Sequence, residues 1–96
     1  MLYMIIGDFR DGDAGPVYRR FRESGRQEPD GLGYVASWVT QDLTRCYQVM
    51  QCDDRALLDE WMARWDLVTF RVVPVMTSAD AAAIVASQSQ DPGHGI

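Results

Sequence analysis

The segment 46–52, CYQVMQC, holds the side chains that first suggest chemistry, two cysteines six residues apart. Such a pair could form a redox couple, bind a metal ion or supply a nucleophile. In a strand, Cys46 and Cys52 share a face but lie about 20 Å apart, and in a helix they lie about 9 Å apart on different sides. A disulfide requires Cα atoms within about 7 Å, so neither conformation allows the two thiols to bridge.

The other partners that cysteine chemistry needs are poorly placed. The only histidine, His94, is close to the C-terminus, so we expect neither a Cys–His pair nor a Ser-His-Asp triad. The cysteines are not spaced as C-x-x-C and no second pair follows, unlike a zinc site. Asp8, Asp11 and Asp13 lack the spacing of a calcium loop. We therefore expect no metal, no cofactor and two buried or half-buried thiols, of which Cys46 could line a ligand pocket.

Gln48 and the tryptophans are the better candidates for binding. A buried amide needs several hydrogen bonds, so Gln48 bonds either to its neighbours, to a symmetry mate or to a ligand. Trp61 and Trp65 are neighbours on one helix face and either fill the core or line an apolar pocket, which typically adds a few polar groups to aromatic walls. The predicted ligand-binding residues are Trp38, Arg45, Cys46, Tyr47, Gln48, Trp61 and Trp65. No catalytic residue is assigned.

The hydrophobic pattern predicts the elements that must position these residues. Strand patterns cover 2–9, 32–39, 45–52 and 67–76, and helical patterns cover 14–25, 55–65 and 79–87. Asp13, the pair Asp53 and Asp54, and Ser78 are the expected N-caps. The order β-α-β-β-α-β is that of an α+β ferredoxin-like domain, whose antiparallel four-stranded sheet has the strand order 4-1-3-2. Pro74 cannot donate to a ladder, so we expect the fourth strand at a sheet edge.

The length of the hairpin loop decides which face carries Trp38. A three- or five-residue loop places Trp38 opposite Cys46, on the face of Gln48. A two- or four-residue loop places it opposite Arg45 instead.

The strands are apolar on both faces, which favours a homodimer. Leu2, Met4 and Ile6 alternate with Tyr3 and Ile5, and two helices can cover only one face. A second subunit stacked on the open face would bury the remainder. We expect one domain over 1–87 and a flexible C-terminal tail over 88–96.

Composition and charge exclude several classes of protein. The net charge is −5, which argues against nucleic-acid binding because such binding needs a basic face. All nine basic residues are arginine, so no lysine is present to form a Schiff base. The sequence has neither an apolar run long enough to span a membrane nor a signal peptide. The expectation is therefore a cytoplasmic protein without a membrane partner.

Six segments together resemble a family of small bacterial proteins of unknown function. They are MLYMIIGDF, VYRRFRESGR, PDGLGYVASWV, RCYQVMQCDD, LLDEWMARWDLV and VVPVMTSADA, and they span residues 1–83. That family adopts the dimeric α/β-barrel form of the ferredoxin-like fold, so the resemblance implies a homodimer whose sheets close into a barrel.

The resemblance leaves two classes of function open. The wider dimeric-barrel superfamily includes cofactor-independent monooxygenases, lactone isomerases, haem-degrading enzymes and plain ligand binders. This chain has no histidine within the fold, so neither a haem ligand nor a histidine base can be transferred to it. We expect a protein that binds a small apolar or aromatic molecule, with a cofactor-free monooxygenase- or isomerase-like activity as a further option. The alternative is a non-catalytic structural or interaction module with a filled core.

Overall fold

A four-stranded antiparallel sheet with helices on one side forms the body of the protein in the computed structural model, which describes residues 1–88. The elements, in order, are β1 (Leu2–Phe9), η1 (Arg10–Gly12), α1 (Gly15–Ser24), β2 (Gly33–Val39), β3 (Arg45–Gln51), α2 (Arg55–Ala63), β4 (Val68–Val75) and α3 (Ser78–Gln88). Every predicted strand and helix is present within two residues of its expected bounds. The α+β ferredoxin-like order is therefore confirmed.

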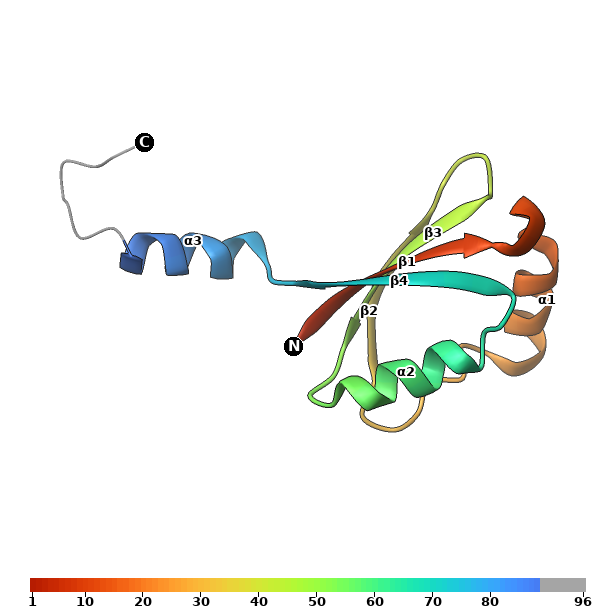
Figure 1. The fold of residues 1–96 in the computed structure, drawn as a ribbon, viewed down its shortest axis with the longest axis horizontal. Helices are drawn as coiled ribbons and strands as arrows, with labels where there is room; N and C mark the ends of the chain where they lie inside the picture. Colours follow the sequence, from red (N-terminus) through yellow and green to blue (C-terminus); the bar gives the residue numbers. More distant parts are fainter. Residues whose placement is uncertain (89–96) are drawn as a thin grey trace.

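The sheet has the predicted topology, with β1 and β3 at its centre. The strand order is β2-β3-β1-β4, and each neighbouring pair is antiparallel (Figure 1). β4 is an edge strand, as Pro74 requires, because a proline lacks the N–H that an interior strand would have to donate. The other edge is β2.

The helix ends follow the capping chemistry of the sequence at α2, whereas α1 and α3 each differ from it by one residue: the N-cap of α1 is Ala14, which makes no side-chain cap bond, and not the expected Asp13. Asp54 caps α2, since its Oδ1 accepts a 2.9 Å hydrogen bond from the Ala56 N–H. Asp13 Oδ1 accepts from the Gly15 N–H at 2.9 Å just before α1. The prediction for Ser78 is wrong by one residue, because Thr77 Oγ1 accepts from the N–H of Asp80 at the start of α3.

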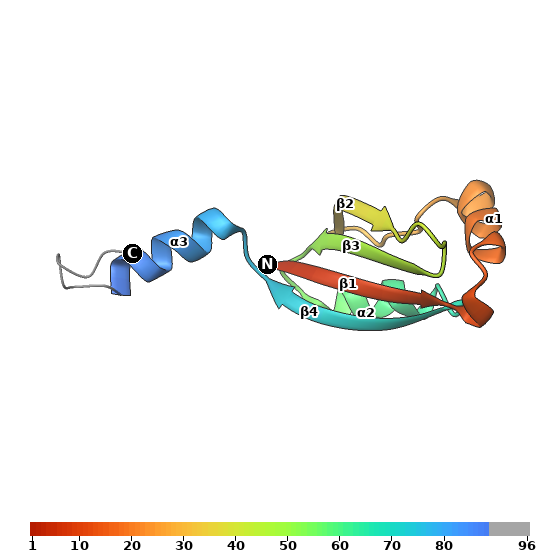
Figure 2. The same ribbon diagram turned by 90° about the horizontal axis from the view of Figure 1, so that it is seen from above.

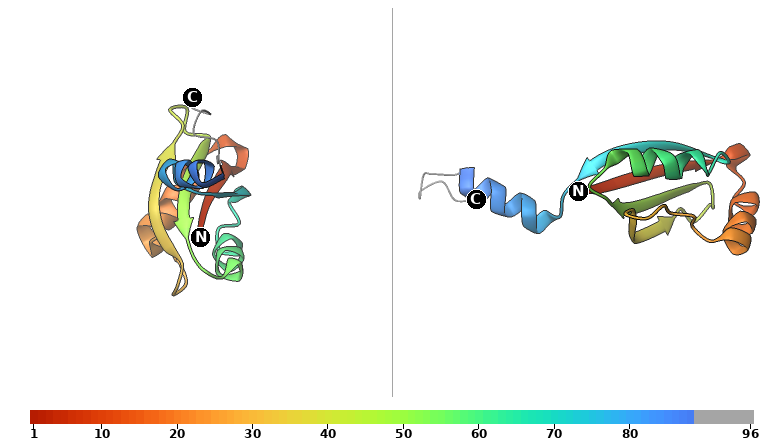
Figure 3. Two further views of the ribbon diagram at one scale, coloured as in Figure 1. Left: turned by 90° about the vertical axis from the view of Figure 1, so that its left-hand side faces the viewer. Right: turned by 90° about the horizontal axis from the view of Figure 1, so that it is seen from below.

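The core lies between α2 and the sheet. Ile5 of β1, Met50 of β3 and Leu58 of α2 are completely buried, and Tyr3, Trp61 and other apolar residues surround them. Figures 2 and 3 show α2 lying across one face of the sheet, whereas no helix covers the opposite face. We call the first the helix face and the second the open face.

The hairpin register corrects one prediction. Val39, and not Trp38, lies opposite Cys46, while Trp38 lies opposite Tyr47. The register shifts between Tyr34 and Ala36, so that β2 carries one extra residue there. Without that bulge, continuing the pairing of Tyr34 with Met50 would have brought Trp38 opposite Cys46. Residues 41–44 make the connecting loop, closed by the Thr40 N–H to Arg45 O hydrogen bond of 2.9 Å.

The last helix, α3, extends away from the sheet (Figures 1 and 2). None of its residues is buried, and Ile84 and Val85 are both exposed. Gln88, predicted to begin the tail, is the final residue of α3, and the rest of the predicted tail lies outside the described residues. Among the residues described, no helix combines the length and apolar character needed to cross a membrane.

Candidate functional site

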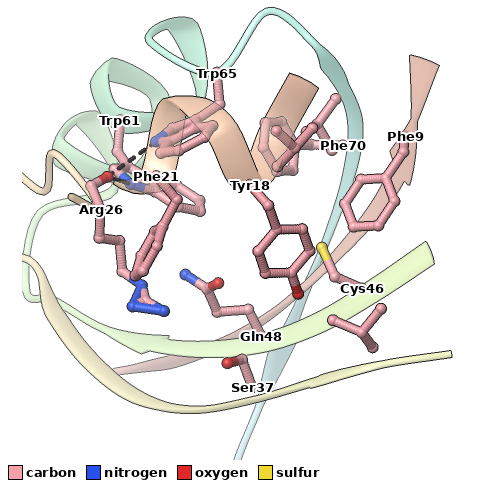
Figure 4. A pocket seen from close by; sticks show the side chains of 13 residues that line it. Phe9, Tyr18, Phe21, Arg26, Ser37, Cys46, Gln48, Trp61, Trp65 and Phe70 are labelled. Atoms are coloured by element: carbon pink, nitrogen blue, oxygen red, sulfur yellow. Dashed lines mark hydrogen bonds between the residues drawn. The ribbon is translucent and has the colours of Figure 1, made fainter. Parts of the chain in front are cut away.

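A cavity of about 250 Å³ lies on the helix face, between the sheet and both α1 and α2. Figure 4 shows the side chains that surround it. The lining residues are Phe9, Val17, Tyr18, Phe21, Arg26, Ser37, Val39, Cys46, Gln48, Trp61, Trp65, Val68 and Phe70. Six of these are aromatic and only a few are polar, which is the usual composition of a site for a small apolar molecule.

The cavity exists because α1 makes only limited contacts with the sheet and core, through Val17 and through the Tyr18 ring, whose centroid lies 6.5 Å from that of Phe9. The helix has no buried residue, although Val17, Tyr18 and Phe21 form an apolar face that is directed at the cavity. A further attachment is lateral and polar: Arg20 Nη1 donates to Asp66 Oδ1 at 2.7 Å and to the Arg64 carbonyl at 3.1 Å. α1 is thus also held to the chain that follows α2.

The sheet side of the cavity depends on a glycine in the central strand. A Cβ atom on Gly7 would lie 2.7 Å from Val68 Cγ1 and 2.9 Å from Cys46 Sγ, closer than van der Waals contact allows. Glycine inside a strand often marks such a close approach. Gly7 therefore lets Cys46 and Phe70 occupy the neighbouring strands without a third side chain between them.

Gln48 is the most deeply buried polar group of the site. Its side chain is only 9 % exposed and projects from β3 into the cavity (Figure 4). The hydrogen bond described for it runs from Nε2 to Met50 Sδ at 3.0 Å, and a thioether is a weak acceptor. Most of the hydrogen-bonding capacity of this amide is therefore available to a molecule in the cavity.

Both tryptophans of α2 bind the same backbone atom. The indole N–H groups of Trp61 and Trp65 donate to the Arg26 carbonyl at 2.8 and 2.9 Å (dashed lines in Figure 4). Buried indoles generally need such an acceptor. The two bonds fix the loop after α1 over the α2 side of the cavity and hold both rings as a wall.

The loop at Arg26 has further local support. Gly25 and Gln27 both have left-handed backbone angles, with φ of 67° and 61°, and Arg64 Nη1 donates to the Gln27 carbonyl at 2.7 Å. The Arg26 guanidinium lies 3.8 Å from the centroid of the Tyr34 ring and 5.1 Å from that of Phe21. Arg26 is therefore fixed at its backbone and stacked at its tip.

The cysteines are free thiols, Cys46 half-buried at the cavity and Cys52 buried in the core. Burial raises the pKa of the Cys46 thiol, so the group is protonated and weakly nucleophilic near neutral pH. No group of three or more His, Cys, Asp or Glu side chains within residues 1–88 is arranged to hold a metal ion. The polar chemistry of this cavity is therefore that of an amide, a hydroxyl or two, a thiol and a guanidinium.

The structure brings four of the seven predicted ligand-binding residues together: Cys46, Gln48, Trp61 and Trp65 all line the cavity. Trp38, Arg45 and Tyr47 lie on the open face instead, which corrects the expectation that Trp38 forms a wall of the pocket. The bulge in β2 turns the side chain of Trp38 to the open face. Arg45 and Tyr47 are the neighbours of Cys46 in β3, so strand alternation places them on the face opposite to it.

Arg45 has a partner of its own on the open face. Its Nε donates to Asp8 Oδ1 at 2.6 Å, and this hydrogen bond raises the pKa of the guanidinium above its ordinary value. Asp66, which follows α2, pairs with Arg20, and this partner lowers the pKa of its carboxyl group.

Residues from α1 and the following loop were missed by the sequence interpretation. Tyr18, Phe21 and Arg26 line the cavity, but the apolar face of α1 was expected to pack on the sheet. One sequence signal pointed to a missing partner: two buried indoles on the same face of a helix require hydrogen-bond acceptors. The loop residue Arg26, which lies between two residues with positive φ, supplies its backbone carbonyl as that acceptor.

The fold and the cavity define a class, an α+β ferredoxin-like domain with an aromatic-lined, partly open pocket between its sheet and its two helices. A family model described as "Domain of unknown function (DUF3303)" matches residues 1–89, and the chain belongs to this family. Neither the curated proteins nor the solved structures compared with the chain include a match.

Proposed function

We propose that the protein binds a small, largely apolar or aromatic molecule in the cavity between α1, α2 and the sheet. The observation that carries this proposal is Gln48, a polar side chain nine-tenths buried with only a thioether as its described partner. Among the described residues no buried side-chain N or O atom lacks a partner, so the remaining polar groups of this amide face accessible space in the cavity, where a bound molecule with a hydroxyl or carbonyl group can form hydrogen bonds with them.

The shape of the cavity supports the same function. An apolar cavity of about 150 Å³ holds benzene, so about 250 Å³ accommodates one ring with substituents. Trp61 and Phe70, whose ring centroids are 5.5 Å apart, offer faces and edges for a flat molecule. A module with a completely filled core would not leave this volume beside α1.

Binding is favoured over catalysis by the chemistry of the lining. A cofactor-free monooxygenase- or isomerase-like enzyme needs a group that can take or deliver a proton near neutral pH. The cavity has one thiol among its lining residues, Cys46, and burial raises its pKa, which makes the thiol a poor base. Gln48 can orient a substituent but cannot exchange a proton in this way.

Blocking the cavity tests the proposal. Neutral aromatic probes, indole and 1-naphthol, should give saturation-transfer NMR signals with the native protein. Cys46→Phe places a ring inside the cavity and should abolish these signals, whereas Leu43→Phe adds the same ring on the exposed hairpin loop and should leave them unchanged. Equal signals from both variants, or none from the native protein, would contradict the proposal.

We also propose that the protein is a homodimer whose subunits cover each other's open faces. On that face Met4 and Ile6 of β1 are half-buried, while Trp38 and Val73 are 57 % and 40 % exposed. An apolar sheet face without a covering layer is typical of an interface, and the isologous contact of two copies is the commonest solution. A stacked pair of this kind corresponds to the barrel that the sequence resemblance implies.

The association state can be measured directly. Sedimentation equilibrium should show a dimer for the native protein, and Val73→Glu should shift the equilibrium toward monomer because it places a charge in the interface. Leu43→Glu, which adds the same charge to the hairpin loop, should leave the dimer intact. A native monomer at high concentration would contradict the dimer without affecting the binding proposal.

A further inference from the structure

We infer that the molecule bound in the cavity is an aromatic carboxylate, whose ring lies between the aromatic walls and whose carboxylate meets Arg26. This inference rests on the proposed binding function and names the chemical class of its ligand. Three features carry it: the unpaired charge of Arg26, its fixed position beside the aromatic lining, and the neutral amide of Gln48 deeper inside.

Arg26 is the one arginine among the residues that line the cavity, and it belongs to the arginines of the described residues that have no carboxylate partner. The arginines with ion pairs in the described part of the chain are Arg20, Arg45, Arg55 and Arg64. Within residues 1–88, no acidic side chain lies within 4.0 Å of the Arg26 guanidinium. Acidic residues outnumber basic ones by 14 to 9 in this chain, so acidic groups are not in short supply.

The position of the Arg26 charge is defined before any ligand arrives. Its carbonyl accepts two indole hydrogen bonds, and its guanidinium plane rests near the rings of Tyr34 and Phe21. A guanidinium that contacts aromatic rings in this way can still donate hydrogen bonds through its N–H groups. The edge of the guanidinium presents two parallel donors, the geometry that matches the two oxygens of a carboxylate.

The interior of the cavity selects the rest of the molecule. Gln48 lies in the floor and is neutral, so it accepts or donates a hydrogen bond without requiring a second charge. The walls are aromatic, and the volume of about 250 Å³ holds a ring with its substituents but not an extended chain. A molecule with one charged end and one flat apolar end therefore satisfies both ends of the site.

The test compares each carboxylate with its neutral carboxamide. Benzoate and 2-naphthoate are charged at pH 7, whereas benzamide and 2-naphthamide have nearly the same shape and no charge. Dissociation constants are measured by NMR titration for the native protein, Arg26→Gln, Arg26→Lys and a control, Arg22→Gln. Arg22 carries the same charge on α1 but does not line the cavity.

The native protein should bind the carboxylates at least about tenfold more tightly than the carboxamides, a difference of about 1.4 kcal/mol. Arg26→Gln should remove this preference by weakening carboxylate binding to the level of carboxamide binding, while the indole bonds remain because they are made to the backbone of residue 26. Arg26→Lys should retain part of the preference, since it keeps the charge but loses the planar fork. Arg22→Gln should behave as the native protein.

The outcomes separate the two proposals. Equal affinity for carboxylate and carboxamide in the native protein overturns the carboxylate inference and leaves a binding pocket for neutral aromatic molecules. A preference that survives Arg26→Gln also overturns it, because the charge that selects the anion then lies elsewhere. No binding of any probe overturns the proposed function and this inference with it.

Discussion

The two helices on the same face of the sheet pack in different ways. α2 buries Leu58 and Trp61 directly against the strands, whereas α1 buries no residue and faces a cavity. Both helices carry apolar residues at helical spacing, so this spacing does not distinguish them. The difference shows that one apolar helix face can serve as core while a similar one serves as the wall of a site.

The attachments of the two helices explain this difference. α2 is bound through its own apolar side chains, so its removal would expose the core. α1 is bound by limited apolar contacts of Val17 and Tyr18, through Arg20 to Asp66 and, in the loop that follows it, through the Arg26 carbonyl to two indoles. These attachments hold α1 without burying any of its residues, and the space between it and the sheet becomes available to a ligand.

The largest expected effect is the loss of a core side chain on the α2 side. Leu58→Ala should lower the free energy of unfolding by about 3 kcal/mol, because it leaves a hole among completely buried neighbours. Phe21→Ala removes a larger side chain from α1 but should lower it by only about 1 kcal/mol, since Phe21 is partly exposed and faces a cavity. Denaturation in urea measures both. Similar losses for the two variants would mean that α1 packs as tightly as α2.

An intermediate effect is expected in thiol reactivity. Cys46 lines the cavity and Cys52 is buried in the core, so a small maleimide should modify Cys46 about tenfold faster. Burial raises the pKa of Cys46 above its ordinary value of 9.0, so the rate should still increase as the pH passes 9. Peptide mapping identifies the modified residue, and denaturation should equalise the two rates. Faster reaction at Cys52 would show that the cavity is closed and the core open.

The smallest effect concerns the ion pair between α1 and the chain after α2. Arg20 lowers the pKa of Asp66, so the stabilisation by this pair is present above the ordinary pKa of 3.8 and is lost as the pH falls further. Asp66→Asn should therefore reduce stability slightly at neutral pH and not at pH 2. Hydrogen exchange should become faster in α1 and stay unchanged in α2.

A matched variant makes that result specific. Asp59→Asn removes an exposed partner of Arg55 within α2 and should leave exchange in α1 unchanged. If both variants accelerate exchange in α1 equally, the Arg20–Asp66 pair is not what holds that helix.

The sequence was sufficient for the elements and their order. Caps such as Asp54, alternation such as that of β1 and the proline in β4 are local signals, and each of them predicted the correct type of element or edge. The face on which Trp38 lies was not predictable in this way. It depends on one extra residue near Val35, and a bulge changes parity without leaving a clear pattern in composition.

The candidate site was predicted only where one element decided its residues. Gln48 and Cys46 share a strand face, and Trp61 and Trp65 share a helix face, so spacing alone grouped each pair. Arg26 entered the site through a loop conformation and through bonds to residues 35 and 39 positions later in the chain. Such long-range backbone contacts leave no periodic pattern in the sequence, so the position of Arg26 in the site becomes visible only in the folded structure.

The isolation of α3 from the core affects how stable its helical structure is. It is 11 residues long and buries none of them, and a helix of that length without tertiary contacts is only marginally stable in water. Its alanines favour the helix, while the exposed side chains of Ile84 and Val85 remain available to another surface. The stability of α3 is therefore expected to depend on the surface that these side chains contact.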